Sequence, residues 1–295
     1  MSLTRVWIAS LLFYLSVFVI CELLRHMINR WLKRNLPRFA IGLLLEVLIK
    51  LLIAFQFVGT LQVCTPMFDV NLILQTYGLF GIFIEITAIE IANGFFLRDA
   101  IAHPCPLITT ASRKRLALRT AFLVFAVQLV AAYLSYFFAR TFWKLGLHPM
   151  HNELLIADHC EADLTASYQA NNCPVALTAG SLIEGLATFS SKAVEFVANE
   201  WYADSRTQML INCMFAGFLT TVGINYTGMY ANPIVAWACT FNCTGVTHLG
   251  HLVVYWLSPL IGWFLADAVF GEQECIVECF TEEREDSNLM KLKNS

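Results

Sequence analysis

From Thr207 to Ala266 the sequence contains no Asp, Glu, Lys or Arg. A helix needs about 20 largely apolar residues to cross a bilayer, so two spans leave a segment near 225–247 that is too apolar for an ordinary exposed loop. Over the whole chain 58% of the residues are hydrophobic and 14% are charged, whereas soluble domains have about 25% charged residues. This composition excludes a soluble enzyme and a disordered scaffold, and the net charge of −3 gives no reason to expect a nucleic-acid partner. We therefore expect an all-α membrane protein that crosses the bilayer several times.

Seven segments are long and apolar enough to span a membrane: Val6–Leu24, Phe39–Gln62, Leu72–Asn93, Leu116–Arg140, Val175–Val197, Met209–Asn225 and His248–Phe270. With seven spans, most of the 19 Lys and Arg residues fall on one side, in 25–38, 98–119, 192–206 and the tail. The positive-inside rule then predicts a cytosolic C-terminus and an N-terminus that is outside or lumenal. The first segment is also compatible with a signal peptide, but its basic residues follow the apolar run, which favours a retained helix.

Two short motifs place a hydrogen-bonding residue directly before a proline. His103-Pro104 follows the third span, and Asn232-Pro233 lies within the charge-free stretch. This order suits a helix N-cap followed by proline at the first helical position. Irregular backbone is tolerated at membrane depth only where it is buried in protein or lines a water-filled cavity. We therefore expect two re-entrant segments, each ending in a half-helix, with a merely apolar loop at 225–247 as the alternative.

The two halves of the chain also resemble each other. Glu46 and Glu184 each lie in the first span of a half. The second copy begins three spans after the first, an odd number, so the second half is inverted in the membrane. Inverted repeats whose broken helices meet at the midplane are an architecture for moving solutes. We divide the chain into an extra N-terminal helix with a basic cytosolic linker, a channel domain with two repeats, and an acidic cytosolic tail, at 1–37, 38–270 (repeats at about 38–140 and 175–270) and 271–295.

The second motif and the last span resemble those of a known family. NYTGMYANPIVAW (Asn225–Trp237) resembles the second re-entrant loop of aquaporins, and VYWLSPLIGWFLA (Val254–Ala266) resembles their last span. Cys105 at the end of the first motif, Cys243 after the second and the extra first span are similar to the unorthodox subcellular subgroup called superaquaporins. The resemblance covers about residues 38–270. It implies a six-helix barrel with two half-helices in each protomer and usually four protomers per assembly.

The resemblance also implies which residues form the pore. They are the first motif, His103, Pro104 and Cys105; the second motif, Asn232, Pro233 and Ile234; the outer constriction, Phe83, Thr220, Met229 and Val235; and the structural residues Glu46, Glu184 and Cys243. The N-termini of the two half-helices would meet, repel protons and cations, and present a hydrogen-bond donor to passing water.

Several positions depart from the usual family pattern. His103 stands where Asn is usual, and we expect a neutral imidazole that imitates Asn, because burial and two helix N-termini oppose a second proton. Val235 stands where Arg is usual, which suggests a more apolar and wider filter that passes glycerol or hydrogen peroxide. Alternatively, Ile234 and Met229 narrow and dewet the path.

Carboxylates inside predicted spans are costly unless they have partners. In the family, Glu at the positions of Glu46 and Glu184 accepts hydrogen bonds from the backbone of the re-entrant loops. Lys50, one turn beyond Glu46, suits an ion pair with it. Glu85 and Glu90 fall on different faces of one helix, so each needs a cavity or a partner that the sequence does not identify.

The loop at 141–174 carries His148, His151, His159 and Cys160, but their spacing defines no four-ligand metal set, and we expect solvated residues there. Cys160 and Cys173 are candidates for a disulfide in an oxidising compartment. Asn242 lies in a glycosylation sequon close to the membrane. We find no nucleophile–base constellation, so no enzyme, cofactor or metal is predicted.

The sequence thus predicts a passive channel for water or a small neutral solute such as glycerol or hydrogen peroxide, expected as a homotetramer in the lipid bilayer. An intracellular membrane such as the endoplasmic reticulum is favoured over the plasma membrane. The alternatives are a seven-span receptor, suggested by the number of spans, and a structural protein that keeps the fold with an occluded pore.

Overall fold

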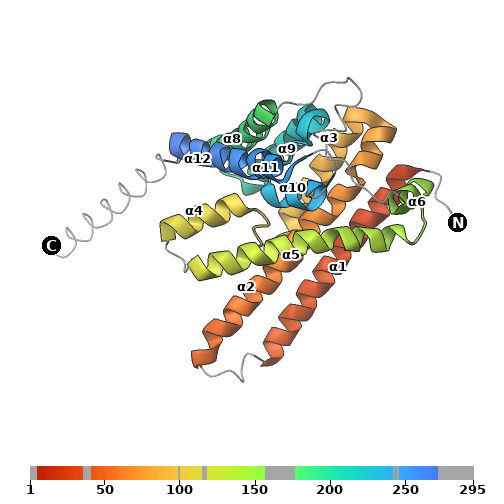
Figure 1. The fold of residues 1–295 in the computed structure, drawn as a ribbon. Helices are drawn as coiled ribbons and strands as arrows, with labels where there is room; N and C mark the ends of the chain where they lie inside the picture. Colours follow the sequence, from red (N-terminus) through yellow and green to blue (C-terminus); the bar gives the residue numbers. More distant parts are fainter. Residues whose placement is uncertain are drawn as a thin grey trace.

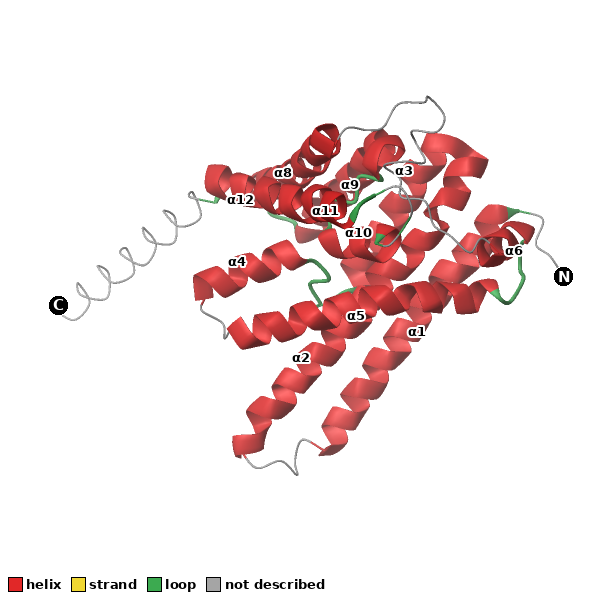
Figure 2. Ribbon diagram, viewed as in Figure 1, coloured by secondary structure: helices red, strands yellow, loops and turns green. Residues whose placement is uncertain are grey.

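The computed structural model describes residues 5–35, 41–98, 100–114, 118–156, 177–241, 243 and 246–271, with only the backbone described at 35, 41–50 and 110–114. The described residues form helices and no strand (Figures 1 and 2). The elements are α1 (Val6–Asn35), α2 (Ile41–Cys64), the 3-10 helix η2 (Thr65–Asp69), α3 (Val70–Phe96), α4 (Pro104–Lys114), α5 (Leu118–Trp143), α6 (Pro149–Ile156), α8 (Leu177–Trp201), α9 (Ser205–Thr227), α10 (Pro233–Thr240), α11 (His248–Leu252), the π-helix η3 (Val253–Leu257) and α12 (Ser258–Phe270).

Within the described residues, five helical stretches are long and apolar enough to cross a membrane: Val6–Arg34, Leu51–Phe96, Leu118–Trp143, Ser205–Thr227 and His248–Phe270. The second stretch joins two of the predicted spans, because η2 connects α2 directly to α3. The predicted span at Val175–Val197 lies largely within α8, a long helix that also contains Glu184, Lys192 and Glu195. The chain is therefore an integral, multi-pass membrane protein.

The third predicted span contains a break that its apolar pattern does not reveal. Within α3, Gly78 has φ 66° and ψ −163°, so the chain leaves the helical conformation there and then resumes it. Glycine adopts this positive φ without a steric penalty. Since apolar residues continue on both sides of Gly78, the hydrophobic pattern alone predicts one uninterrupted helix.

The helices contact one another in corresponding pairs. In the first half α2 packs on α5, and in the second half α8 packs on α12, while α3 and α9 contact each other across the two halves. The two short helices that follow the proline motifs each contact the other half, since α4 contacts α5 and α12, and α10 contacts α5 and α2. Figure 2 shows that α4 and α10 each begin at a loop in the interior of the bundle.

The first helix is part of the packed core. Its contacts are with α2, α3 and η2 (Figure 1). Phe13, Val17 and Cys21 are buried in one cluster with residues of α2 and α5. Two polar contacts also join α1 to α3 and to the residues just after it: the Tyr14 hydroxyl donates to Glu85, and Glu22 pairs with Arg98. Tyr14 is thus a partner for one of the two acidic residues of the third predicted span.

A buried polar cluster secures α6. Asp69 is fully buried and accepts hydrogen bonds from Trp143 Nε1 at 2.8 Å and from His151 Nε2 at 3.0 Å. The expectation that His151 is a solvated loop residue is therefore wrong, because its ring is 1% exposed. Within the described part of the chain no group of three or more His, Cys, Asp or Glu side chains is arranged to hold a metal ion.

Cys243, which follows α10, is disulfide-bonded. The other cysteines that the structure describes are thiols, so the partner of Cys243 lies outside the described residues. Cys160, Cys173 and the sequon residue Asn242 also lie outside them.

Replacing Cys243 with serine is expected to destabilise the protein by about 2–4 kcal/mol, because the disulfide restricts the unfolded chain. The measurement is thermal unfolding in detergent under oxidising conditions, with Cys213→Ala on α9 as the control that removes a thiol outside the bond. A reducing agent should lower the unfolding temperature of the wild type and leave that of Cys243→Ser unchanged. Identical melting curves of the wild type and of Cys243→Ser under oxidising conditions would contradict the prediction.

Candidate pore and its two capping residues

The residues before the two prolines cap the helices that follow them. Asn232 Oδ1 accepts a hydrogen bond from the Ile234 N–H at 3.0 Å, and Pro233 is the first residue of α10. His103 Nδ1 accepts one from the Cys105 N–H at 3.2 Å at the start of α4. Because the backbone N–H is the donor, Nδ1 must be the unprotonated ring nitrogen and Nε2 must carry the hydrogen. His103 is thus a neutral imidazole that caps its helix as an asparagine does.

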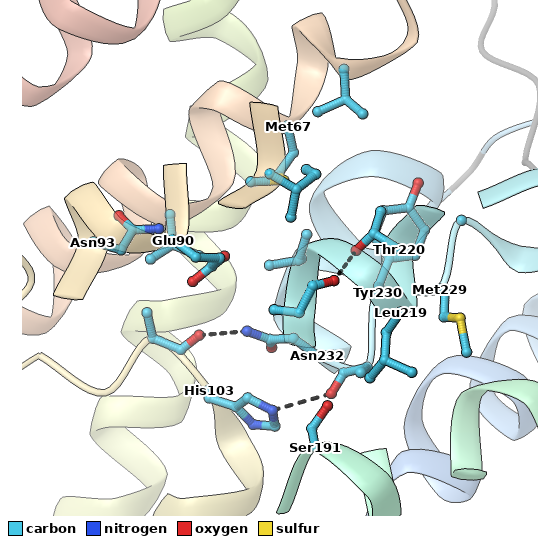
Figure 3. Close-up of a pocket in the computed structure, with 18 of the residues that line it drawn as sticks. Met67, Glu90, Asn93, His103, Ser191, Leu219, Thr220, Met229, Tyr230 and Asn232 are labelled. Carbon is cyan, nitrogen blue, oxygen red and sulfur yellow. Dashed lines mark hydrogen bonds between the residues drawn. The ribbon is translucent and has the colours of Figure 1, made fainter. Parts of the chain in front are cut away.

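Each cap also reaches the other motif. His103 Nε2 donates to the Ala231 carbonyl at 3.2 Å, and Asn232 Nδ2 donates to the Ala102 carbonyl at 3.0 Å (Figure 3). Ala102 and Ala231 have φ of 47° and 48°, a left-handed conformation that is uncommon for residues other than glycine. The two motifs therefore repeat the same backbone conformation and the same hydrogen bonds, and these bonds bring the N-termini of α4 and α10 together.

The two caps differ in the hydrogen-bond donors that they leave for another molecule. The Asn232 amide has two N–H groups and gives one to Ala102, so one remains. The neutral His103 ring has a single N–H, and Ala231 accepts it. In this geometry His103 has no donor left for passing water, and only the second motif retains one.

Glu184 on α8 holds the chain that leads into the second motif. Its side chain is fully buried. Oε1 accepts from the Thr227 hydroxyl at 2.7 Å and from the Tyr230 N–H at 3.2 Å, and Oε2 accepts from the Ala231 N–H at 2.9 Å. One carboxylate thus satisfies three donors of an irregular segment. The corresponding residue Glu46 is in α2, but its side chain and that of Lys50 lie outside the described part of the structure.

A cavity of about 260 Å³ lies beside the two caps, and both His103 and Asn232 line it (Figure 3). Water occupies about 30 Å³ in the liquid, so this volume has room for several water molecules or one small solute. Of the four residues predicted to form a constriction, Thr220, Met229 and Val235 line the cavity.

Phe83 does not line this cavity, so the structure does not place it with the other three. At this level α9 packs directly on the backbone of α3, since a Cβ added to Gly217 would lie 3.0 Å from the Phe83 carbonyl oxygen. From α3 the cavity is lined by Val70, Asn71, Ile86, Glu90 and Asn93, and Leu97 directly after the helix lines it as well.

The remaining motif residues are packed inside the protein. Pro104 and Pro233 are buried, and Cys105 and Ile234 are fully inaccessible. Ile234 belongs to a core cluster with Val63 and Cys64 of α2 and does not line the cavity, whereas Met229, the other residue expected to narrow the path, does. Because Pro233 already belongs to α10, the helix directs the next side chain toward α2 and α5 instead of the cavity.

Sequence reasoning did not place Glu90 and Asn93 at the cavity, nor most of the other residues that line it. The sequence marks Glu90 as an acid inside a span that needs a cavity or a partner without identifying either, and it does not single out Asn93. The available signal was helical spacing, because positions 86, 90, 93 and 97 fall on one face of an α-helix.

No model of a known protein family matches the chain. The chain is 26% identical to "Aquaporin-11" of Milnesium tardigradum over 86% of its own length and 83% of that protein. It is 25% identical to "Putative aquaporin-10" of Caenorhabditis elegans, with 75% and 76% covered, and 23% identical to human "Aquaporin-11", with 73% and 76% covered. These similarities confirm the resemblance to the aquaporin family that the two motifs indicate. The chain is an aquaporin-like membrane protein, and its relatives include proteins named Aquaporin-11.

Replacing Glu184 with glutamine is expected to destabilise the protein by about 2–4 kcal/mol, because an amide NH2 group would face backbone or hydroxyl donors that the carboxylate now satisfies. Thermal unfolding in detergent measures the effect. Glu200→Gln, an exposed carboxylate on the same helix, is the matched control and should unfold as the wild type does. An equal unfolding temperature for Glu184→Gln and Glu200→Gln would show that the three hydrogen bonds do not hold the loop.

Proposed function

We propose that this protein is a passive channel for water and small neutral solutes, with a pore that passes the N-termini of α4 and α10. The observation that carries the proposal is the pair of reciprocal hydrogen bonds, His103 to Ala231 and Asn232 to Ala102, at the wall of a cavity. The names of the relatives support the same conclusion.

The proposed architecture is a barrel of six spans, formed by α2, α3, α5, α8, α9 and the α11–α12 stretch. In this arrangement α4 and α10 are re-entrant half-helices and α1 is an extra helix. The corresponding contacts of the two halves and the shared conformation of Ala102 and Ala231 support an inverted repeat.

Two electrostatic features would prevent the passage of protons and cations. Helix N-termini carry partial positive charge, and two of them converge at the caps. Asn232 retains one N–H that would orient a passing water molecule, while the neutral His103 adds no charge. Glu184, and by analogy Glu46, would serve as a structural support for these segments.

We further propose that the pore passes glycerol or hydrogen peroxide as well as water. Val235 lines the cavity at the position where the family usually has Arg, and Thr220 and Met229, which line it too, are also uncharged. A homotetramer with a cytosolic C-terminus, in an intracellular membrane such as the endoplasmic reticulum, follows from the family resemblance and the distribution of basic residues. The division into residues 1–37, 38–270 and 271–295 is part of the same proposal.

Stopped-flow measurements on vesicles that contain the purified protein test the channel, and Asn232→Asp tests its centre. Aspartate keeps the acceptor of the cap but loses the N–H groups and adds a negative charge that would hold cations between the helix N-termini. We expect the water flux of this variant to fall to nearly that of protein-free vesicles, with Glu200→Gln unchanged. Wild-type flux in a folded Asn232→Asp protein would remove Asn232 from the pore. Baseline fluxes of water, glycerol and peroxide through the wild type, at several pH values and in several lipids, would instead favour a structural protein with an occluded pore.

Val235→Arg tests the width of the filter. An arginine here would restore a cation and fill part of the cavity. We expect the flux of glycerol to fall about tenfold and that of water by much less, because glycerol needs the larger opening. Equal losses for the two permeants would contradict a filter that Val235 widens.

A further inference from the structure

A second cavity shares part of its lining with the first. This cavity has a volume of about 430 Å³ and is lined by residues of α3, α8 and α9. Glu90, Asn93 and Leu97 line both cavities. These three residues, at the C-terminal end of α3 and directly after it, thus lie between the capping residues and the second cavity.

The orientation of Asn93 is fixed by a neighbouring helix. Its side chain is 3% exposed, and its Oδ1 accepts a hydrogen bond from Gln62 Nε2 of α2 at 3.1 Å. The Asn93 Nδ2 lies near the Glu90 carboxylate, yet it makes no hydrogen bond of ordinary geometry within the described part of the chain. A buried amide donor without a partner is costly, so this position is suited to bind an acceptor atom of another molecule.

Glu90 faces the same space. Figure 3 shows its side chain pointing into the cavity, toward Asn232, from the helix that also carries Asn93. The N-termini of α4 and α10 lie on that side, and their partial positive charge favours a nearby carboxylate. No ion pair of Glu90 is present among the described residues. Glu90 lines the cavity, so its side chain contacts whatever occupies this space.

We propose that Glu90 and Asn93 form a binding site for a small polyol on its way through the pore, with glycerol as the simplest example. The Glu90 carboxylate accepts hydrogen bonds from two hydroxyl groups, and Asn93 Nδ2 donates to the oxygen of one of them. Ile86, Leu97 and Leu219 line the same space and would contact the carbon chain. A polyol offers adjacent hydroxyl groups that fit this donor and acceptor pair together. The inference rests on the proposed channel function and names the residues that favour one class of permeant.

The decisive variant is Glu90→Gln, because it keeps the size of the side chain while it removes the charge and one acceptor oxygen. In vesicles we expect the ratio of glycerol to water permeability to fall about threefold to tenfold, the factor that one hydrogen bond contributes. Water permeability should stay within about twofold, since water also binds well to an amide. Glu200→Gln should leave both permeabilities unchanged. An unaltered ratio in a conducting Glu90→Gln protein would overturn the proposed site and leave the channel function intact.

A binding measurement separates this proposal from the channel itself. Saturation-transfer NMR with glycerol on the full-length protein in detergent reports contact without requiring conduction. We expect a signal from the wild type and from Glu200→Gln, and a weaker signal from both Glu90→Gln and Asn93→Ala. Equal signals from all four proteins would overturn the polyol site whether or not the wild type conducts. Absent flux with a signal that depends on Glu90 would reject only the channel.

Discussion

The reciprocal hydrogen bonds between the two caps are the interaction on which the rest of this structure depends. Each of these side chains must satisfy the first turn of its own helix and a carbonyl of the opposite motif at the same time. Inside a bilayer no water is available for a backbone group that lacks a partner. The positions of the neighbouring helices follow from this requirement. Glu184 must be on α8 at the height of Ala231, and α3 must be far enough away to leave a cavity beside the caps.

The use of histidine in one cap and asparagine in the other makes the proposed centre of the pore asymmetric. Both rings and amides can accept at one atom and donate at another, which is why His103 fits a position with the backbone conformation of Asn232. They differ in the number of hydrogens. The first motif therefore makes hydrogen bonds only within the protein, whereas the second also retains an N–H group for another molecule. The approximate symmetry of the backbone is consequently not a symmetry of chemistry.

Much of this arrangement was predictable from the sequence because it depends on local rules. Apolar length predicted the spanning helices, and the order of a polar residue and a proline predicted the starts of α4 and α10. The errors concern contacts between distant elements. The sequence does not reveal that α9 packs at Gly217 directly against the backbone of Phe83 in α3. It also does not reveal that Ile234 of α10 lies in a core cluster.

The titratable residues inside the predicted spans show the same limit, because the sequence does not identify their partners. The pattern marked Glu85 and Glu90 as unusual, but only the packing distinguishes a carboxylate bonded to Tyr14 from one that faces a cavity. Likewise, nothing in the sequence around His151 indicates its buried hydrogen bond to Asp69, which lies far earlier in the chain.

The bond between Tyr14 and Glu85 has a consequence for how the protein is made. Synthesis runs from the N-terminus, so α1 enters the bilayer before α3 leaves the ribosome. When Glu85 enters the membrane, the Tyr14 hydroxyl that donates a hydrogen bond to it is already there. A nascent chain without that first helix would deliver an acidic group into hydrocarbon at a cost of about 2.5–3.5 kcal/mol on translocon scales. In the folded protein α1 thus supplies the hydrogen-bond partner of an acidic residue of α3.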